Sequence, residues 1–419
     1  MYVHRLITPR LLRLTEHFPV VVLSGARQVG KSTLLREALG PAWPTVVFDP
    51  VVDVENARQD PELFLANRKP PVVLDEIQYA PELVPAIKRL VDRDRRPGRY
   101  VITGSQQWEV MRSLAESLAG RAVFLDLEGF SLNEKSHDPD LGPWLPRWLL
   151  RRDEIFSEGW RRLDLGRTLW ETLWRGSLPD AWLLPLDVIP DLVRSYQRTY
   201  VERDVRLMAE ISDWQLFGRF LRLCGALSAQ EVNASQVGRE IGLSPQSARR
   251  WLDILKATWQ WFELPAYTGN TIKRVSSRPK GFLADSGLAC HAQAISSPHA
   301  IGGHPNQGAL FETAVVAELR KQCALMSPQP VMYHWRSHRG AEVDVVVDYD
   351  GVLYPIEIKL KSRPSRRDTT GITAFRKNHA HLDVGPGLVV CPTEAPLRLN
   401  ERDWAIPWDL GIVIGAGGD

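Results

Sequence analysis

Short apolar runs alternate with segments of helical periodicity in the first third of the chain. The runs are rich in β-branched residues and are too short to be buried helices. They cover residues 20–23, 45–48, 72–75, 100–103 and 122–127. Parallel strands are buried on both faces and therefore have continuous apolar sequences, with helices in the intervals between them. The pattern predicts an α/β fold with a five-stranded parallel sheet and a ligand site at the carboxyl ends of its strands.

The middle of the chain is predicted to be mainly helical. Helical periodicity covers residues 189–208 and 214–227, both with mixed charge. The segment before them, residues 137–186, is rich in Trp, Pro and Arg. We expect a small helical lid or connector there.

A helix-turn-helix is predicted over residues 233–255. Apolar residues repeat along one face of two short helical segments, and Gly242 separates the two. Ser244 is suited to cap the second helix, and Pro245 suits its first turn. The aromatic segment that follows, residues 257–267, would supply a wing.

The second helix of this pair is the part that would enter a DNA major groove. Winged helices also serve as dimer or peptide modules. We favour DNA, because two adjacent arginines beside Gln and Ser match the chemistry of phosphates and base edges. The expected contact residues are Gln246, Ser247, Arg249 and Arg250.

Alternating apolar residues on both sides of the turn at residues 348–351 predict a β-hairpin near the C-terminus. Asp344 lies on its first strand, and Glu357 and Lys359 share one face of the second. Two such carboxylates can hold a divalent metal, and a lysine beside them can activate water for phosphodiester hydrolysis. Glu312, in the preceding helical segment, would complete this nuclease-like cluster.

Glu-x-Lys pairs are common on solvated strands, and the pair at Glu357 and Lys359 stands out only because apolar residues flank the glutamate. Basic residues follow it as far as Arg367. They form either a track for phosphates or a charged loop.

Composition narrows the class of protein. At roughly 150 residues per domain, 419 residues suggest about three domains. A net charge of +2 shows no dominant field of one sign, but a basic face on one domain can be offset elsewhere, so nucleic acid is not excluded. Four cysteines without a C-x-x-C pair argue against a disulfide scaffold and a zinc ribbon. Without a signal-peptide pattern or a membrane-length apolar run, we expect a soluble cytoplasmic protein with no membrane partner.

A glycine-rich segment follows the first predicted strand and precedes a helical pattern. Its sequence, GARQVGKST, matches G-x-x-x-x-G-K-[ST] at every fixed position. Glycines let the backbone curl so that N–H groups surround phosphate oxygens at a helix N-terminus. Lys31 would reach the β- and γ-phosphates of ATP, and Ser32 would bind Mg²⁺. The predicted nucleotide-binding residues are Gly25, Ala26, Arg27, Gln28, Val29, Gly30, Lys31, Ser32 and Thr33.

Two acids end the third predicted strand, about 40 residues beyond the glycine-rich segment. Asp75 would hold Mg²⁺, and Glu76 would orient or deprotonate the attacking water, which favours ATP hydrolysis over binding alone. The next strand places small polar side chains where a γ-phosphate sensor would lie. Ser105 is the better candidate and Thr103 the alternative, although either could be part of an ordinary turn.

Arg121 precedes the fifth predicted strand and is our candidate for stabilising charge in the transition state of hydrolysis. It could act on its own subunit or on a neighbour. Arg27, inside the glycine-rich segment, competes for the same role. A solvated arginine at a strand start is the plain alternative.

These segments together resemble a large family of prokaryotic AAA-type ATPases whose C-terminal domain is poorly characterised. The similar stretches run from about Val20 to Lys361 and include GARQVGKST, VVLDEIQ, PKGFLADSGL and GAEVDVVV. The resemblance implies a RecA/AAA-like ATPase fold, a winged helix and a C-terminal fold similar to PD-(D/E)XK nucleases. The residues that match the nuclease motif are Glu312, Asp344, Glu357 and Lys359.

We therefore expect an ATPase domain at 1–135, a helical connector at 136–212, a winged helix at 213–275 and a nuclease-like domain at 276–419. The leading hypothesis is an Mg²⁺-dependent ATPase that acts on duplex or branched DNA as a homo-oligomer, with a ring as one arrangement. The alternative is a nucleotide-controlled switch that binds a protein and keeps the nuclease-like domain as an inert scaffold.

Overall fold

The chain divides into two compact units in the computed structural model. The first unit comprises Met1–Gly129, Ser195–Glu210 and Asp253–Gln260. The second comprises Phe130–Arg194, Ile211–Leu252 and Trp261–Asp419. The structure describes residues 2–48, 54–104, 118–156, 159–200, 205, 211, 213–269 and 277–414.

A five-stranded sheet forms the centre of the first unit. Its strands are β1 (Val20–Ser24), β2 (Thr45–Val47), β3 (Val72–Asp75), β4 (Tyr100–Gly104) and β5 (Ala122–Asp126). They lie in the order β2-β3-β4-β1-β5, and every neighbouring pair is parallel. The predicted five-stranded parallel sheet is confirmed.

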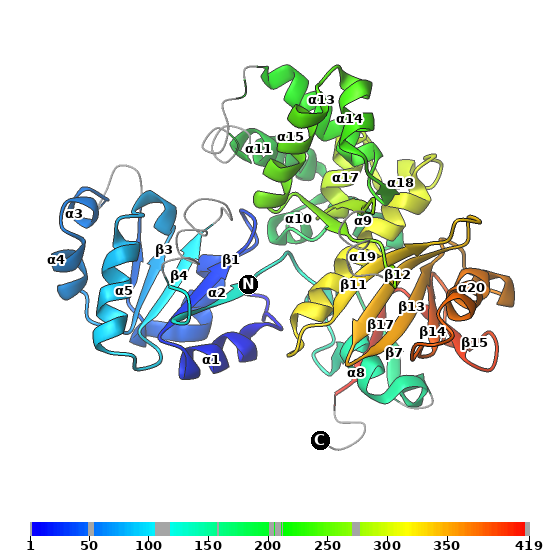
Figure 1. The fold of residues 1–419 in the computed structure, drawn as a ribbon, viewed down its shortest axis with the longest axis horizontal. Helices are drawn as coiled ribbons and strands as arrows, with labels where there is room; N and C mark the ends of the chain where they lie inside the picture. Colours follow the sequence, from blue (N-terminus) through cyan, green and yellow to red (C-terminus); the bar gives the residue numbers. More distant parts are fainter. Residues whose placement is uncertain are drawn as a thin grey trace. The chain divides into compact units, whose positions relative to one another are not determined.

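Helices cover this sheet (Figure 1). They are α1 (Thr8–His17), α2 (Lys31–Leu39), α3 (Val54–Gln59), α4 (Pro61–Ala66) and α5 (Leu83–Arg93). The last three bury apolar side chains such as Phe64 and Ile87 against Val22, Leu74 and Ile102 of the strands. Helix α2 is the next element after β1, so the loop between them lies at the carboxyl ends of the strands.

A six-stranded mixed sheet lies in the second unit. Its strands are β11 (Val331–Arg336), β12 (Glu342–Tyr349), β13 (Val352–Ile358), β14 (Gly387–Cys391), β15 (Leu397–Arg398) and β16 (Asp403–Pro407). The order is β11-β12-β13-β14-β16-β15. Strands β12 and β13 are antiparallel and joined by the turn at residues 350–351, which confirms the predicted hairpin. Helices α19 (Gln307–Ala324) and α20 (Thr370–Asn378) pack on this sheet.

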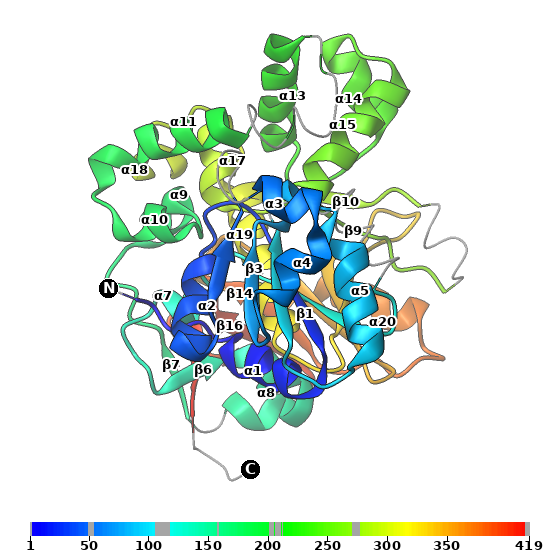
Figure 2. The ribbon, with the colours of Figure 1, turned by 90° about the vertical axis from the view of Figure 1, so that its left-hand side faces the viewer.

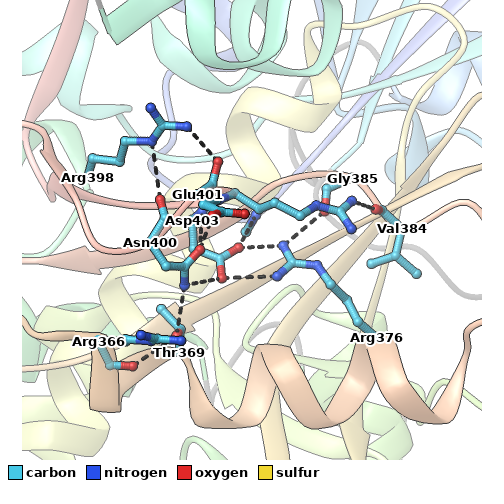
Figure 3. Close-up of polar contacts among 11 residues, drawn as sticks. Arg366, Thr369, Arg376, Val384, Gly385, Arg398, Asn400, Glu401 and Asp403 are labelled. Atoms are coloured by element: carbon cyan, nitrogen blue, oxygen red, sulfur yellow. Dashed lines mark hydrogen bonds and ion pairs between the residues drawn. The ribbon is translucent and has the colours of Figure 1, made fainter.

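A buried ion network fixes α20 to the far strands of this sheet (Figure 3). Asp403 is fully buried and receives hydrogen bonds from Arg376, from the side-chain amide of Asn400 at 2.8 Å and from the backbone N–H of Gly387 at 2.9 Å. Arg376 also donates to the carbonyl of Gly385 at 3.1 Å. Each charged group of the network therefore has several partners in place of water.

Three helices and a small sheet form the predicted helix-turn-helix region, and Figures 1 and 2 both show the helices together. The helices are α13 (Trp214–Ala226), α14 (Ala234–Ile241) and α15 (Pro245–Ala257). The strands β8 (Gln230–Glu231), β9 (Trp261–Leu264) and β10 (Lys280–Leu283) form an antiparallel sheet in the order β8-β10-β9. Trp251 of α15 packs on Phe217 and Phe220 of α13 at ring-centroid distances of 5.2 and 5.3 Å.

The segment expected to be a helical connector also contains strands. Its helices are α7 (Leu132–Lys135), α8 (Trp144–Arg151), α9 (Leu169–Arg175) and α10 (Pro179–Leu183). Two short strands, β6 (Leu141–Pro143) and β7 (Trp160–Arg162), pair with β17 (Leu410–Val413). The partner strand is some 250 residues away in the sequence, so local periodicity did not indicate this sheet.

Two short helices, α17 (Ser286–Ala292) and α18 (Pro298–Ile301), also belong to the second unit. A long helix was expected at residues 189–208, and α11 (Ile189–Thr199) forms its first part. Across the described ranges, no helix has both the length and the apolar character needed to cross a membrane.

Candidate functional site

The glycine-rich loop between β1 and α2 has the backbone shape that its glycines predict. A Cβ atom on Gly25 would lie 2.1 Å from the carbonyl oxygen of Leu127, so only glycine fits there. Gly30, with φ at 91°, caps α2 in a left-handed conformation. The loop thereby turns sharply into the helix and presents the helix N-terminus to the carboxyl edge of the sheet.

Lys31 is already held inside this loop. Its ammonium group donates hydrogen bonds to the carbonyl oxygens of Gly25 at 2.9 Å and Ala26 at 2.8 Å, and the residue is only 6% exposed. The next residue, Ser32, is exposed on the first turn of α2. A buried ammonium group held by neutral carbonyls can readily exchange them for anionic phosphate oxygens, which are better partners.

Asp75, Glu76 and Thr103 meet where β3 and β4 end. The hydroxyl of Thr103 donates to the carboxylate of Asp75, and the backbone N–H of Glu76 donates to the Thr103 hydroxyl at 3.1 Å. Glu76 adopts a left-handed conformation with φ at 59°, which is uncommon for a residue with a side chain. Its carboxylate accepts a hydrogen bond from Gln78. Backbone strain of this kind is often found at functional sites.

The donor set at this loop fits Mg²⁺. Asp75 supplies a carboxylate and Ser32 a hydroxyl, both oxygen ligands of the type that Mg²⁺ binds beside nucleotide phosphates. Of the two sensor candidates, Thr103 is tied to Asp75, and Ser105 lies outside the described residues.

Arg121 lies at the amino ends of the strands, whereas the glycine-rich loop lies at their carboxyl ends. It precedes β5, whose first residue pairs with the first residue of β1, and the two sites are separated by one strand length of roughly 15 Å. Its guanidinium group binds both carboxylate oxygens of Asp92, at 2.5 and 3.0 Å. This hydrogen bond lowers the pKa of Asp92 and raises that of Arg121. The geometry does not fit action on the same subunit's phosphates.

Arg5 is a loop residue that the sequence reasoning missed. It is 4% exposed and donates to the carbonyl of Val29 at 2.7 Å and to that of Glu128 at 2.6 Å. It therefore ties the glycine-rich loop to the segment after β5. No motif marks this residue, because its role depends on a contact with a segment 123 residues away.

The four nuclease-like residues do meet in the second unit. Lys359 lies 2.9 Å from Glu357 and 3.5 Å from Asp344, and the backbone N–H of Ile358 donates to Asp344 at 2.9 Å. Glu312, from α19, joins the cluster through an ion pair with Lys280. A pocket of about 550 Å³ opens beside them and is also lined by His334 and Arg336.

Lys280 is the second residue that the sequence reasoning missed. It is the first residue of β10 and makes ion pairs with Glu312 and, at 3.2 Å, with Asp344. The only sequence signal was its place in the PKGFLADSGL stretch, where a lysine without a regular pattern around it suggested no role.

Burial and charge set the ionisation of the cluster. Burial raises the pKa of Glu312 to about 8, and the negative charge of Asp344 adds to this effect. Burial and the charge of Asp344 also raise the pKa of Glu357 well above its usual range. Burial alone would raise the pKa of Asp344 too, but the ammonium groups of Lys280 and Lys359 outweigh it and lower that pKa. The acids in turn raise the pKa of both lysines.

The cluster does not fit the divalent metal that the nuclease-like interpretation implies. One oxygen of Asp344 faces Lys280, and the other faces Lys359 and the Ile358 N–H. Within the described ranges, no group of three or more His, Cys, Asp or Glu side chains is arranged to hold a metal ion. The predicted metal role of Asp344 and Glu357 therefore has no support in the geometry, because lysines take the coordination positions.

The predicted DNA-contact residues lie on one helix. Gln246, Arg249 and Arg250 are exposed on α15. Ser247 is half-buried, and its N–H donates to the side-chain hydroxyl of Ser244 at 3.1 Å. Gln246 and Arg249 line a groove of about 960 Å³ together with Arg278. The inward residues of the predicted helix, Ala248, Leu252 and Leu255, are buried as expected: they are 0%, 4% and 0% exposed.

Comparisons with known proteins identify one part of the chain. Residues 17–135 match the family described as AAA domain. Residues 166–299 and 307–410 match two families described as domains of unknown function, DUF8612 and DUF4143.

Similar proteins cover nearly the whole chain. It is 28% identical to the uncharacterized protein Rv2008c of Mycobacterium tuberculosis (strain ATCC 25618 / H37Rv). The similar region has 410 residues and covers 97% of this chain and 84% of that protein. The same values hold for the uncharacterized protein Mb2031c of Mycobacterium bovis (strain ATCC BAA-935 / AF2122/97). Among solved structures, the Walker-type ATPase PABY2304 of Pyrococcus abyssi is similar over 68% of this chain and 94% of that one, at 16% identity and a TM-score of 0.39.

The match to the AAA domain coincides with the parallel sheet and the glycine-rich loop described above. The chain therefore contains an AAA-type P-loop ATPase domain.

Proposed function

We propose that this protein is an Mg²⁺-dependent ATPase that hydrolyses ATP and acts on DNA. The observation that carries hydrolysis is the arrangement at the loop, where Lys31 is held in place and Thr103 joins Asp75 to the backbone of Glu76. This arrangement positions both a phosphate-binding cation and the acids that hydrolysis needs.

The roles of the loop residues follow from their positions. Lys31 exchanges its two carbonyl partners for phosphate oxygens, while Ser32 and Asp75 hold Mg²⁺, which neutralises charge on the phosphates. Glu76 orients the attacking water, since its carboxylate is held by Gln78 and its backbone by Thr103. Thr103 keeps Asp75 in one orientation, as a hydrogen-bonded neighbour of a metal ligand does.

The groove on α15 supports DNA as the partner. Exposed arginines at 249 and 250 suit phosphates, and Gln246 suits base edges. Arg278 lines the same groove and extends its basic character beyond the helix. In this proposal α14 and α15 with the three-stranded sheet form the winged helix, and the nucleotide cycle moves DNA held there.

ATP turnover measured with and without duplex, forked and four-way DNA tests the proposal. We expect at least one DNA to raise turnover, and Arg249→Ala with Arg250→Ala to remove the increase but keep basal turnover. Arg13→Ala, at an exposed position on α1, is the control and should respond to DNA like the parent. No change in turnover with any DNA would exclude the DNA-acting role and leave the ATPase intact.

The lysine-filled carboxylate cluster favours a second candidate function. In it, the protein is a nucleotide-controlled switch that binds a protein partner, with the nuclease-like region as an inert scaffold. Asp344→Ala and Lys359→Ala test whether the cluster catalyses DNA cleavage or only supports the fold. Loss of Mg²⁺-dependent DNA cleavage in these variants would show catalysis, whereas a parent protein without cleavage favours the scaffold.

A further inference from the structure

The cluster at Asp344 contains a cation of its own. Lys280 lies between Glu312 and Asp344 and pairs with both carboxylates. Lys359 pairs with the other oxygen of Asp344 and with Glu357 at 2.9 Å. Three acids therefore share two ammonium groups, and both oxygens of the central acid are engaged.

We propose that Lys280 is a built-in counter-ion that takes the place of a divalent cation between Glu312 and Asp344, so that this cluster binds no Mg²⁺ or Mn²⁺. The inference concerns the C-terminal cluster alone and does not depend on ATP hydrolysis or on DNA binding.

The strand that carries Lys280 is firmly placed. Lys280 pairs with Leu264 of β9 and with Glu231 of β8. A Cβ atom on the next residue, Gly281, would lie 2.0 Å from the ring of Trp261 and 2.7 Å from Val232, so the strands here are in close contact. The lysine side chain is only 12% exposed. Its ammonium group is therefore held between the two carboxylates with little exposure to water.

Access does not explain the absence of a metal site. The pocket of about 550 Å³ exposes this side of the cluster, and Lys280, Glu312 and Asp344 all line it. Hydrated cations can therefore reach the acids. What excludes them is chemistry: two ammonium groups repel a divalent ion and already satisfy the oxygens that it would need.

Binding of Mn²⁺ by isothermal titration calorimetry tests the proposal. The full chain is used without nucleotide and with Asp75→Asn, so that the nucleotide loop contributes no second metal site. In this background we expect no Mn²⁺ binding by the parent. We expect Lys280→Met to gain one Mn²⁺ site that the parent lacks, because removing a paired positive charge exposes two carboxylates.

A stability measurement accompanies the titration. Lys280→Met leaves buried acids without their counter-ion, so we expect a lower melting temperature that Mn²⁺ restores. Lys377→Met, which removes an exposed lysine of α20, should change neither melting nor Mn²⁺ binding. Adding Asp344→Asn to Lys280→Met should remove the gained site. If the methionine variant does not fold, Lys280→Gln replaces it.

Two results would overturn the proposal. One is Mn²⁺ binding by the protein with Lys280 intact that disappears on Asp344→Asn, because the cluster would then be a native metal site. The other is a folded Lys280→Met or Lys280→Gln variant that gains neither Mn²⁺ binding nor Mn²⁺-dependent melting, because the lysine would then not occupy a cation's place.

Discussion

Single side chains decide what the nucleotide loop can do. Lys31 and Arg5 both bind backbone carbonyls of the loop, but from opposite directions: Lys31 from within the motif and Arg5 from the N-terminal segment. In our proposal Lys31 binds phosphates, whereas Arg5 holds the loop in shape. Their substitution should therefore have different kinetic consequences.

Lys31→Ala should reduce ATP turnover by about 100-fold or more, because it removes a cation that stabilises charge on the transferred phosphoryl group. Turnover under saturating ATP is the measurement. Lys69→Ala, at an exposed position, is the matched control. Equal turnover in the Lys31 variant and the parent would show that the loop does not hydrolyse ATP.

Arg5→Ala should weaken ATP binding by about tenfold, because two hydrogen bonds from a charged donor no longer hold the loop. The effect should appear mainly in KM, with a smaller change in kcat. Arg5→Lys should give an intermediate result, since an ammonium group lacks the forked geometry that reaches two carbonyls. An unchanged KM would mean that the loop keeps its shape without Arg5.

Packing between elements explains where charge can be buried in the second unit. Asp403 of β16 is fully buried and Arg376 of α20 is half-buried, and backbone groups complete their hydrogen bonds (Figure 3). Lys135, at the end of α7, is also buried; its ammonium group lies 5.0 Å from the ring of Trp182, and the residue lines a cavity together with Asp285 and Glu318. The two cases should respond to mutation and pH in different ways.

Arg376→Met should destabilise the second unit by about 3–5 kcal/mol, because Asp403 would remain buried without its charged partner. Combining it with Asp403→Asn should recover part of the loss. Urea unfolding followed by tryptophan fluorescence measures both variants. Arg194→Met removes an exposed ion pair with Asp191 and should cost about 0–1 kcal/mol. A similar small effect at Arg376 would contradict the network's role.

The contribution of Lys135 to stability should rise as the pH increases above about 7. Burial, and to a lesser degree the charge of Lys321, lowers the pKa of Lys135 to about 7, whereas the unfolded chain keeps the ordinary lysine value near 10.4. Between these values Lys135 binds more protons in the unfolded state, so the contribution of this residue to the free energy of unfolding increases with pH. Lys135→Met should flatten this slope between pH 7 and about 9, and Lys377→Met should not. An equal slope in both variants would contradict the assignment.

At the scale of the whole molecule, the question is whether Arg121 contributes to the ATP site of its own copy or to that of a neighbouring copy. Arg121 is one strand length from its own glycine-rich loop and is held by Asp92. In our proposal it serves a neighbouring copy in a homo-oligomer, as arginines supplied in trans do in other nucleotide hydrolases. The proposal predicts complementation between two inactive variants.

Lys31→Ala and Arg121→Ala should each be nearly inactive, and an equimolar mixture should recover roughly a quarter of the parent's turnover, since only interfaces that combine an intact loop with an intact arginine are active. Arg93→Ala, at an exposed position at the end of α5, is the control. Full activity of Arg121→Ala alone would remove the arginine from the reaction.

Local patterns were sufficient for the elements that are contiguous in sequence. The parallel strands, the hairpin at β12 and β13, and the inward face of α15 follow from apolar spacing, because burial on one or two faces acts within a few residues. The strands β6 and β7 were missed, because their partner β17 is remote in the sequence. The same limit applies to Arg5 and Lys280, whose partners lie on other elements.

The amino-acid sequence by itself determined the nucleotide loop, since its function needs glycines, a lysine and a hydroxyl at fixed spacing along one turn of backbone. It also indicated which acids would gather near Asp344. Only the tertiary structure decided what that gathering means, because the charge balance of a buried cluster depends on every group that the fold brings to it. Lys280 comes from a strand outside the motif and makes ion pairs with two acids of the predicted cluster.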